Sequence, residues 1–185
     1  MTPFAVATGL GIASSSFFFF GNLGMTTCGV IKMVSSPQER QRLDINADRA
    51  VALWADMYEA GKKTFAPTAL ATAASFFVAS LTVQNTSSAP QRELAARLFL
   101  ASSLVSLTIV PFTIMVMLPN INPLIATRNR ILAQRTKGEL TILQGAEAEQ
   151  ALQGIQIWKR QNLARMAIGF VSMALGTGAA ALLLQ

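Results

Sequence analysis

The sequence predicts an all-α protein, an integral membrane four-helix bundle with an additional cytoplasmic amphipathic helix. Hydrophobic residues make up 52% of the 185 residues and charged residues only 13%, whereas a soluble domain has about 25% charged residues. The charges are clustered, and four windows contain no Asp, Glu, Lys or Arg: residues 1–31, 64–91, 98–127 and 166–185. Each window has the roughly 20 residues with which a helix crosses hydrocarbon. A soluble bundle helix would carry charges along one face, so we expect a single four-span membrane domain over residues 1–185.

The first span is expected at about residues 4–31. A cleaved signal peptide begins with basic residues, but here the first basic residue is Lys32, after the apolar run. Asn22 is the polar exception within the span, and a polar side chain at that depth usually faces the bundle interior. Asn22 would either bond another helix or line a ligand cavity.

The second span is expected at about residues 65–83, after a polar first connection. Pro37 ends any helix that continues from the first span. Further on, Val51, Trp54 and Tyr58 follow the spacing of one helix face. The stretch around them therefore forms either an amphipathic helix at the cytoplasmic interface or a long extension of the second span.

The third span is expected at about residues 94–118. Pro111 lies inside it and predicts a kink, because proline cannot donate the helical hydrogen bond to the carbonyl of Leu107. The sequence from Pro119 to Pro123 predicts that the helix ends at the cytoplasmic boundary.

The fourth span is expected at about residues 162–184, after a polar third connection much of which has a helical composition. Ser172, Gly176 and Ala180 recur at a spacing of four and so form one face of small residues. Membrane helices approach closely where side chains are small, so this face is expected to pack against another helix.

The basic residues predict how the spans are oriented. The first connection carries six Lys and Arg residues and the third carries seven, whereas the second carries two. By the positive-inside rule the first and third connections are cytoplasmic and both termini are luminal, and we expect the endoplasmic reticulum membrane. The lipid bilayer is then the main partner, and the net charge of +6 requires no nucleic acid to explain it. The sequon at Asn85 falls on the luminal side, too near the membrane to predict glycosylation.

Three groups of polar and aromatic residues are expected at the cytoplasmic helix ends. Each has side chains suited to bind or polarise a substrate: Trp54, Asp56, Tyr58 and Glu59 before the second span, Asn120, Asn122 and Arg128 after the third, and Trp158, Asn162 and Arg165 at the start of the fourth. The last three residues fall on one helix face. The alternative is an interfacial belt of Trp and Tyr with snorkelling arginines, which many membrane proteins have.

Four short motifs, in this order, resemble the DUF1772 membrane family, which includes the fungal anthrone oxygenases. The motifs are Trp54-x3-Tyr58-x2-Gly61, Pro111-Phe112-Thr113, Met117-Leu118-Pro119-Asn120-Ile121-Asn122-x-Leu124 and Trp158-x3-Asn162-x2-Arg165. The family's four-span architecture agrees with the predicted spans, so the resemblance covers nearly the whole chain. Where this chain has Asn120-Ile121-Asn122 after the proline, the family typically has Thr-Asn followed by Leu.

The resemblance implies a cofactor-free monooxygenase of secondary-metabolite biosynthesis, an oxidoreductase that converts an anthrone to an anthraquinone with O2 as co-substrate. A base would remove an acidic proton, a donor would stabilise the anion, and an apolar pocket would hold the substrate. Family members often carry a His near the last motif, where this chain has Asn162 and no His at all. The base would then be Asp56, Glu59 or Tyr58, or the reaction would be an isomerisation, cyclisation or dehydration of a related substrate.

We therefore expect a membrane enzyme that takes an apolar polycyclic substrate of polyketide or terpenoid type from the bilayer, without a metal or other cofactor. Arg165, Asn162 and Asn122 are expected to polarise a substrate oxygen. The substrate-binding residues are expected to be Asn22, Trp54, Asn120, Asn122 and Trp158, with the two tryptophans packed against the substrate. The competing hypothesis is a non-catalytic four-span scaffold or carrier, and either protein would be compatible with a homo-oligomer.

Overall fold

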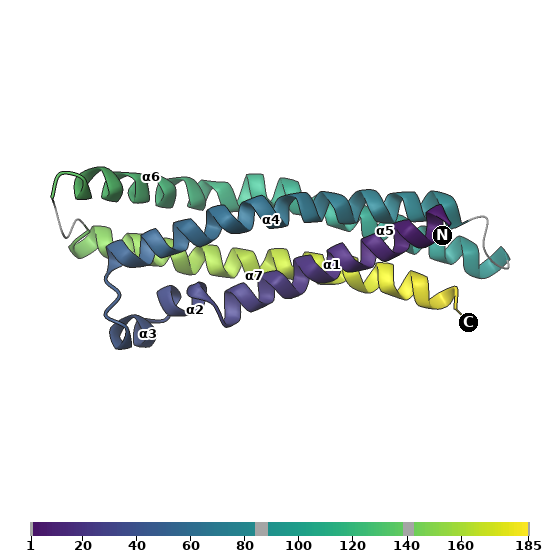
Figure 1. Cartoon of the computed structure of the whole chain (residues 1–185), viewed down its shortest axis with the longest axis horizontal. Helices are drawn as coiled ribbons and strands as arrows, with labels where there is room; N and C mark the ends of the chain where they lie inside the picture. The colour runs from purple at the N-terminus through teal and green to yellow at the C-terminus, as the bar shows by residue number, and fades with distance from the viewer. Residues whose placement is uncertain (1, 84–88, 139–142, 185) are drawn as a thin grey trace. The chain divides into compact units, whose positions relative to one another are not determined.

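A computed structural model describes residues 2–83, 89–138 and 143–184, and every regular element within these ranges is a helix (Figure 1). Within the same ranges, four stretches are long and apolar enough to cross a membrane: Pro3–Thr27, Ala47–Thr82, Gln91–Arg135 and Gly145–Leu182. The all-α fold with four spans is therefore confirmed, and the chain is an integral membrane protein. The sequon at Asn85 lies outside the described residues.

The first span ends earlier than predicted. Helix α1 covers Pro3–Thr27, and a short helix α2 covers Val30–Ser35. Between them Gly29 has an extended backbone (φ −94°, ψ −157°) and is the N-cap residue that precedes α2. The expected span of residues 4–31 therefore runs across a helix break, because composition alone does not distinguish a glycine within a helix from one between helices.

Helix α3 (Pro37–Arg42) follows α2 directly, and the break expected at Pro37 is confirmed. The Ser36 hydroxyl accepts a hydrogen bond from the Glu39 N–H at 3.3 Å, which is the usual role of serine just before a helix. Pro37 occupies the first turn, where its missing N–H costs nothing.

Helix α4 (Ala47–Thr82) is continuous through the stretch around Trp54. The Asn46 side-chain oxygen accepts a hydrogen bond from the Arg49 N–H at 2.9 Å and so stabilises the start of the helix. Of the two alternatives for this stretch, the extension of the second span is the one observed, and the predicted amphipathic helix is the N-terminal part of α4.

The third span does not end at Pro119, and this prediction was wrong. Helix α5 (Ala89–Phe112) continues through a π-helical segment, η2 (Thr113–Met117), into helix α6 (Leu118–Arg135). The Leu118 N–H donates to the Thr113 carbonyl, five residues back, so the chain widens its helix just after the proline at position 111. Pro119 then falls in the first turn of α6, where proline is tolerated. The kink expected at Pro111 stays a prediction, and what the structure shows is a π-helical segment that begins two residues later.

Helix α7 (Gly145–Leu182) contains the fourth span and also much of the third connection, which is helical as expected. The predicted span of residues 162–184 covers only its C-terminal part and extends two residues beyond its end. At the other side of the connection Gly138 has φ +89°, a left-handed conformation that favours glycine beyond the end of α6.

The chain forms two compact units, each built from segments distant in sequence. Unit 1 contains Met1–Asn22, Thr64–Pro111 and Arg165–Gln185, and unit 2 contains Leu23–Lys63 and Phe112–Ala164. The single domain over residues 1–185 stays a prediction. All the candidate site residues except Asn22 and Arg165 belong to unit 2.

Unit 1 is a bundle of parts of α1, α4, α5 and α7 (Figure 1). The face of small residues on α7 packs as expected. A Cβ atom added at Gly176 would lie 2.2 Å from the ring of Phe76, so only glycine allows this approach. One turn earlier on the same helix, the Ser172 hydroxyl donates to the Ser102 carbonyl at 2.9 Å, and the Ser102 hydroxyl donates to the Ser172 carbonyl at 2.6 Å.

Unit 2 has its own apolar core, formed by side chains of α2, α4, α6 and α7 among others. Its largest fully buried side chains are Trp54, Trp158, Ile31, Met117, Ile121, Ile131 and Ile155. Both tryptophans of the candidate site therefore lie in this core.

Candidate functional site

Three aromatic side chains of unit 2 form what we call the aromatic cluster: Trp54 and Tyr58 of α4 and Trp158 of α7. Trp54 and Tyr58 are four residues apart and so project from one face of the helix. Their rings are stacked, with centroids 5.5 Å apart and planes at 7°. Trp158 meets Trp54 edge to face, with centroids 5.9 Å apart and planes at 81°. The exposed fractions of the three residues are 0%, 8% and 1%, so the cluster lies inside unit 2.

Each tryptophan of the cluster has a buried indole nitrogen that makes no hydrogen bond with the described residues. Neither the Trp54 Nε1 nor the Trp158 Nε1 has a hydrogen-bond partner among the described residues. Leaving a buried donor unsatisfied costs about 1–3 kcal/mol, and such groups in folded proteins often have a catalytic role or bind a water or ion. The cluster therefore offers two buried N–H donors that no acceptor among the described residues satisfies.

Asn162 lies one turn after Trp158 on α7 and is fully buried. Its amide nitrogen donates to the Thr26 hydroxyl oxygen at 2.9 Å, within unit 2. Of the three residues expected on one face of this helix, Trp158 and Asn162 are both buried. Thr26 was not identified from the sequence, because its partner is 136 residues away.

Arg165 and Asn22 meet within unit 1. The Arg165 Nη2 donates to the Asn22 Oδ1 at 3.0 Å, and the Asn22 amide nitrogen donates to the Phe18 carbonyl at 2.7 Å. The Arg165 guanidinium carbon also lies 5.9 Å from the centroid of the Phe18 ring, within the range of a cation–π contact. Of the two uses expected for Asn22, the bond to another helix is the one observed.

The three candidates for the base differ in their surroundings. The Asp56 Oδ1 accepts from the Arg128 Nη2 at 2.8 Å, and the Asp56 side chain is 66% exposed. The Glu59 carboxylate is half-exposed and lies 3.9 Å from the Lys62 ammonium. Exposed ion pairs of this kind contribute at most about 1 kcal/mol. Only Tyr58 is both buried and part of the aromatic cluster.

The two asparagines of α6 are not brought together. The Asn120 amide nitrogen donates to the Gly154 carbonyl of α7 at 2.9 Å, whereas Asn122 is exposed. Asn120 and Asn122 were expected to lie in one polar group because the helix was expected to end at Pro119. Because α6 continues as a helix, residues two apart project from nearly opposite sides. Asn122 therefore does not lie with the buried Asn162.

Two buried anchors of unit 2 were missed from the sequence. Asp48 is 1% exposed and accepts a hydrogen bond from the Leu143 N–H at 2.9 Å. Its position three residues before Val51, on the apolar face of α4, was the available signal. The carbonyl and hydroxyl of Ser35 accept hydrogen bonds from Gln156 and Lys159 of α7, and no local pattern predicts these contacts.

Outside the apolar core, partial burial lowers the pKa of the Arg40 guanidinium below its ordinary value. The Arg40 Nη1 donates to the Val34 carbonyl at 2.9 Å, at the end of α2. Among residues 2–83, 89–138 and 143–184, no three His, Cys, Asp or Glu side chains gather as metal ligands would. The expectation of an enzyme without a cofactor stays a prediction.

Fold and site together define an all-helical integral membrane protein with a buried cluster of aromatic side chains and unsatisfied N–H donors. The family model described as anthrone oxygenase matches residues 54–175, well over half of the chain, and the chain belongs to this family. The match begins at Trp54 and includes Trp158, Asn162 and Arg165, so the resemblance to the DUF1772 family is confirmed. No curated protein and no solved structure matches the chain.

Proposed function

We propose that the protein is a membrane enzyme of natural-product biosynthesis that oxidises an apolar polycyclic substrate, as an anthrone oxygenase does, with O2 and without a bound cofactor. The family supports the class of reaction. The observation that carries the proposal is the pair of buried indole N–H groups of Trp54 and Trp158, which have no hydrogen-bond partner in the described part of the chain.

The chemistry suits an anthrone. Loss of a proton from its central CH2 group forms a carbanion that is also an aromatic phenolate, so negative charge moves onto an oxygen. The electron-rich ring then reacts with O2: one oxygen atom becomes the second carbonyl, the carbon loses both its hydrogens, and the other oxygen atom leaves as water. The protein has only to accept a proton and stabilise an oxyanion in an apolar environment.

The side chains of unit 2 supply these functions. The indole N–H groups of Trp54 and Trp158 donate to the developing oxyanion, and Tyr58, stacked on Trp54, accepts the proton as its phenolate and returns it to the oxygen atom that leaves as water. Asn162, held by Thr26, keeps the α7 face beside Trp158 in place. Asp56 and Glu59 are engaged with cations at the surface of the chain, so they are the weaker candidates for the base.

We also propose that the protein resides in the endoplasmic reticulum membrane, with luminal termini and the basic connections in the cytoplasm. The supporting observation is the distribution of the Lys and Arg residues, which are scarce in the second connection and abundant in the other two. An apolar substrate would then reach the enzyme from the bilayer.

The test uses the full chain in lipid nanodiscs with 1,8-dihydroxyanthrone under air, following quinone absorbance and O2 uptake. Trp54→Phe and Trp158→Phe keep an aromatic ring but remove the N–H donor. Each is expected to lower kcat/KM by about 10²–10³-fold, as the loss of one oxyanion donor does, with an unchanged thermal unfolding midpoint.

Substitutions of the three candidate bases complete the test. Tyr58→Phe is expected to abolish quinone formation above the spontaneous rate, whereas Asp56→Asn and Glu59→Gln retain it. Full turnover in both tryptophan variants would overturn the proposed roles of the donors. A wild-type chain that forms no quinone from the anthrone would overturn the oxygenase assignment itself.

A further inference from the structure

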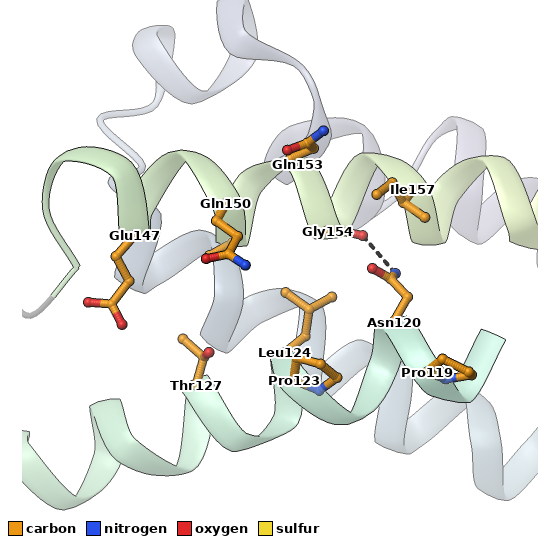
Figure 2. Close-up of a pocket in the computed structure, with 11 residues that line it drawn as sticks. Pro119, Asn120, Pro123, Leu124, Thr127, Glu147, Gln150, Gln153, Gly154 and Ile157 are labelled. Carbon is orange, nitrogen blue, oxygen red and sulfur yellow. Dashed lines mark hydrogen bonds between the residues drawn. The ribbon is translucent and has the colours of Figure 1, made fainter.

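A second feature of unit 2 lies between α6 and α7, where residues 119–127 face residues 147–157 across a cavity of about 410 Å³ (Figure 2). We call it the α6/α7 pocket. Its volume lies within the range of roughly 300–1,000 Å³ that is usual for small-molecule sites. None of the three residues of the aromatic cluster lines it.

The pocket lies between two contacts that hold the helices together. At one end the Asn120 amide bonds the Gly154 carbonyl at 2.9 Å. A Cβ atom at Gly154 would lie 3.1 Å from the Leu124 side chain, so the helices are in close contact there. At the other end Arg130 forms an ion pair with Glu147. The hollow between these contacts is therefore a built feature of the helix pair.

The pocket lining contains both hydrogen-bond acceptors and donors. The Asn120 N–H2 group is committed to Gly154, and its carbonyl oxygen faces the pocket (Figure 2). The amides of Gln150 and Gln153 and the Thr127 hydroxyl can each accept and donate. A hydroxyl group also does both, so a hydroxylated ligand suits this lining.

Two further properties of the pocket restrict the chemical class of the ligand. Glu147 is the only charged residue in the lining and is already paired with Arg130, so the pocket favours a neutral molecule. Leu124, Ile157 and the proline rings supply apolar walls. Flat rings pack well on such walls, while Gln150 and Thr127, which face each other across the pocket in Figure 2, accept or donate at the edges.

We propose that the α6/α7 pocket binds a neutral, hydroxylated aromatic molecule, as a second site apart from the aromatic cluster. The choice of a fused tricyclic ring rests on the proposed function, but the preference for phenolic hydroxyls rests on the polar side chains of the pocket alone. Such a site would hold the phenolic substrate or product outside the place of reaction.

The test is protection of a cysteine in the pocket. Cys28 is the only cysteine of the chain, so Cys28→Ser provides a cysteine-free background. Thr127→Cys then places a thiol in the pocket wall, and Ala126→Cys, on the neighbouring exposed position of α6, is the matched control. The full chain in nanodiscs is treated with a maleimide at increasing concentrations of 1,8-dihydroxyanthraquinone, or of anthraquinone without hydroxyls.

The dihydroxy compound is expected to slow labelling of Thr127→Cys at least tenfold at saturation and to leave Ala126→Cys within twofold of its rate without ligand. Anthraquinone is expected to protect at concentrations at least tenfold higher. Equal protection of both cysteines, no protection of Thr127→Cys, or equal protection by both compounds overturns the proposal. If Thr127→Cys does not react even without ligand, Gln150→Cys on the opposite wall replaces it.

This measurement does not depend on turnover. If the anthrone yields no quinone while Thr127→Cys is protected by the dihydroxy compound, the proposed reaction fails and the pocket stands. If quinone forms and Thr127→Cys is not protected, the reaction stands and the second site fails.

Discussion

The Arg165 guanidinium donates a hydrogen bond to the Asn22 side-chain oxygen at 3.0 Å, and the two residues are 143 positions apart in the sequence. Asn22 is fully buried and also donates to the Phe18 carbonyl of its own helix. An arginine in an apolar bundle requires such polar partners, because an unpaired charge in hydrocarbon is costly. The bond joins α1 to α7 in unit 1.

Asn22→Ala removes the acceptor from Arg165. A hydrogen bond to a charged group contributes about 1.5–3 kcal/mol. The free energy of unfolding of the variant is therefore expected to be lower by that amount. The measurement is thermal or SDS-induced unfolding in detergent. Asn122→Ala, at an exposed asparagine of α6, is the control and is expected to change little. Equal effects of the two substitutions would show that the bond to Arg165 contributes nothing.

Two glycines of α7 provide a matched test of helix packing. A Cβ atom at Gly176 would lie 2.2 Å from the Phe76 ring, whereas one at Gly178 would meet nothing within 4 Å. Gly176→Ala is expected to destabilise the chain by about 1–3 kcal/mol through overpacking. Gly178→Ala is expected to be neutral or to stabilise by about 0.5–1 kcal/mol, because glycine is unfavourable within a helix. The unfolding midpoints of the two variants give the comparison, and a stable Gly176→Ala would contradict the observed approach of Phe76.

Ser102 and Ser172 form reciprocal hydrogen bonds in unit 1, at 2.6 and 2.9 Å to each other's carbonyls. A double-mutant cycle with Ser102→Ala and Ser172→Ala is expected to give a coupling energy of about 0.5–2 kcal/mol. The same cycle between Ser102 and Ser80, whose hydroxyl bonds its own helix at the Phe77 carbonyl, is expected to be additive. Additivity in both cycles would show that the serine pair is not energetically coupled.

The orientation of the spans is tested with single cysteines in the Cys28→Ser background. Thr136→Cys, just after α6, is expected to react with a membrane-impermeant maleimide in sealed microsomes, because the basic connections are expected in the cytoplasm. Thr2→Cys, just before α1, is expected to react only after the membrane is permeabilised. Both positions are exposed, so accessibility within the protein does not limit the comparison. The opposite pattern would reverse the orientation.

The spans could be predicted because a membrane helix is specified by local composition. The boundaries could not, and the third span shows the reason. Pro119 and Pro123 suggest a helix end, but the π-helical turn at Thr113–Met117 changes the register before them, so Pro119 falls in a first turn. Whether a proline ends a helix or begins one depends on the hydrogen bonds of the preceding turn, which residue types alone do not specify.

The candidate site was predictable only in part for a related reason. Periodicity places Trp54 with Tyr58, and Trp158 with Asn162, since residues four apart share a helix face. It does not indicate that Trp54 meets Trp158, that Thr26 bonds Asn162, or that Asn122 is exposed. These relations are between helices and depend on how each helix is rotated about its axis.

The sequence by itself therefore determined that this is a four-span helical membrane protein of the anthrone oxygenase family, because hydrophobic length and short motifs are local properties. Only the tertiary structure decided which polar groups find partners. Within the residues that the structure describes, it left the indole N–H groups of Trp54 and Trp158 buried without a partner, and it gave Arg165 the amide oxygen of Asn22. Partners come from helices far apart in the chain, and packing, which no single segment encodes, selects them.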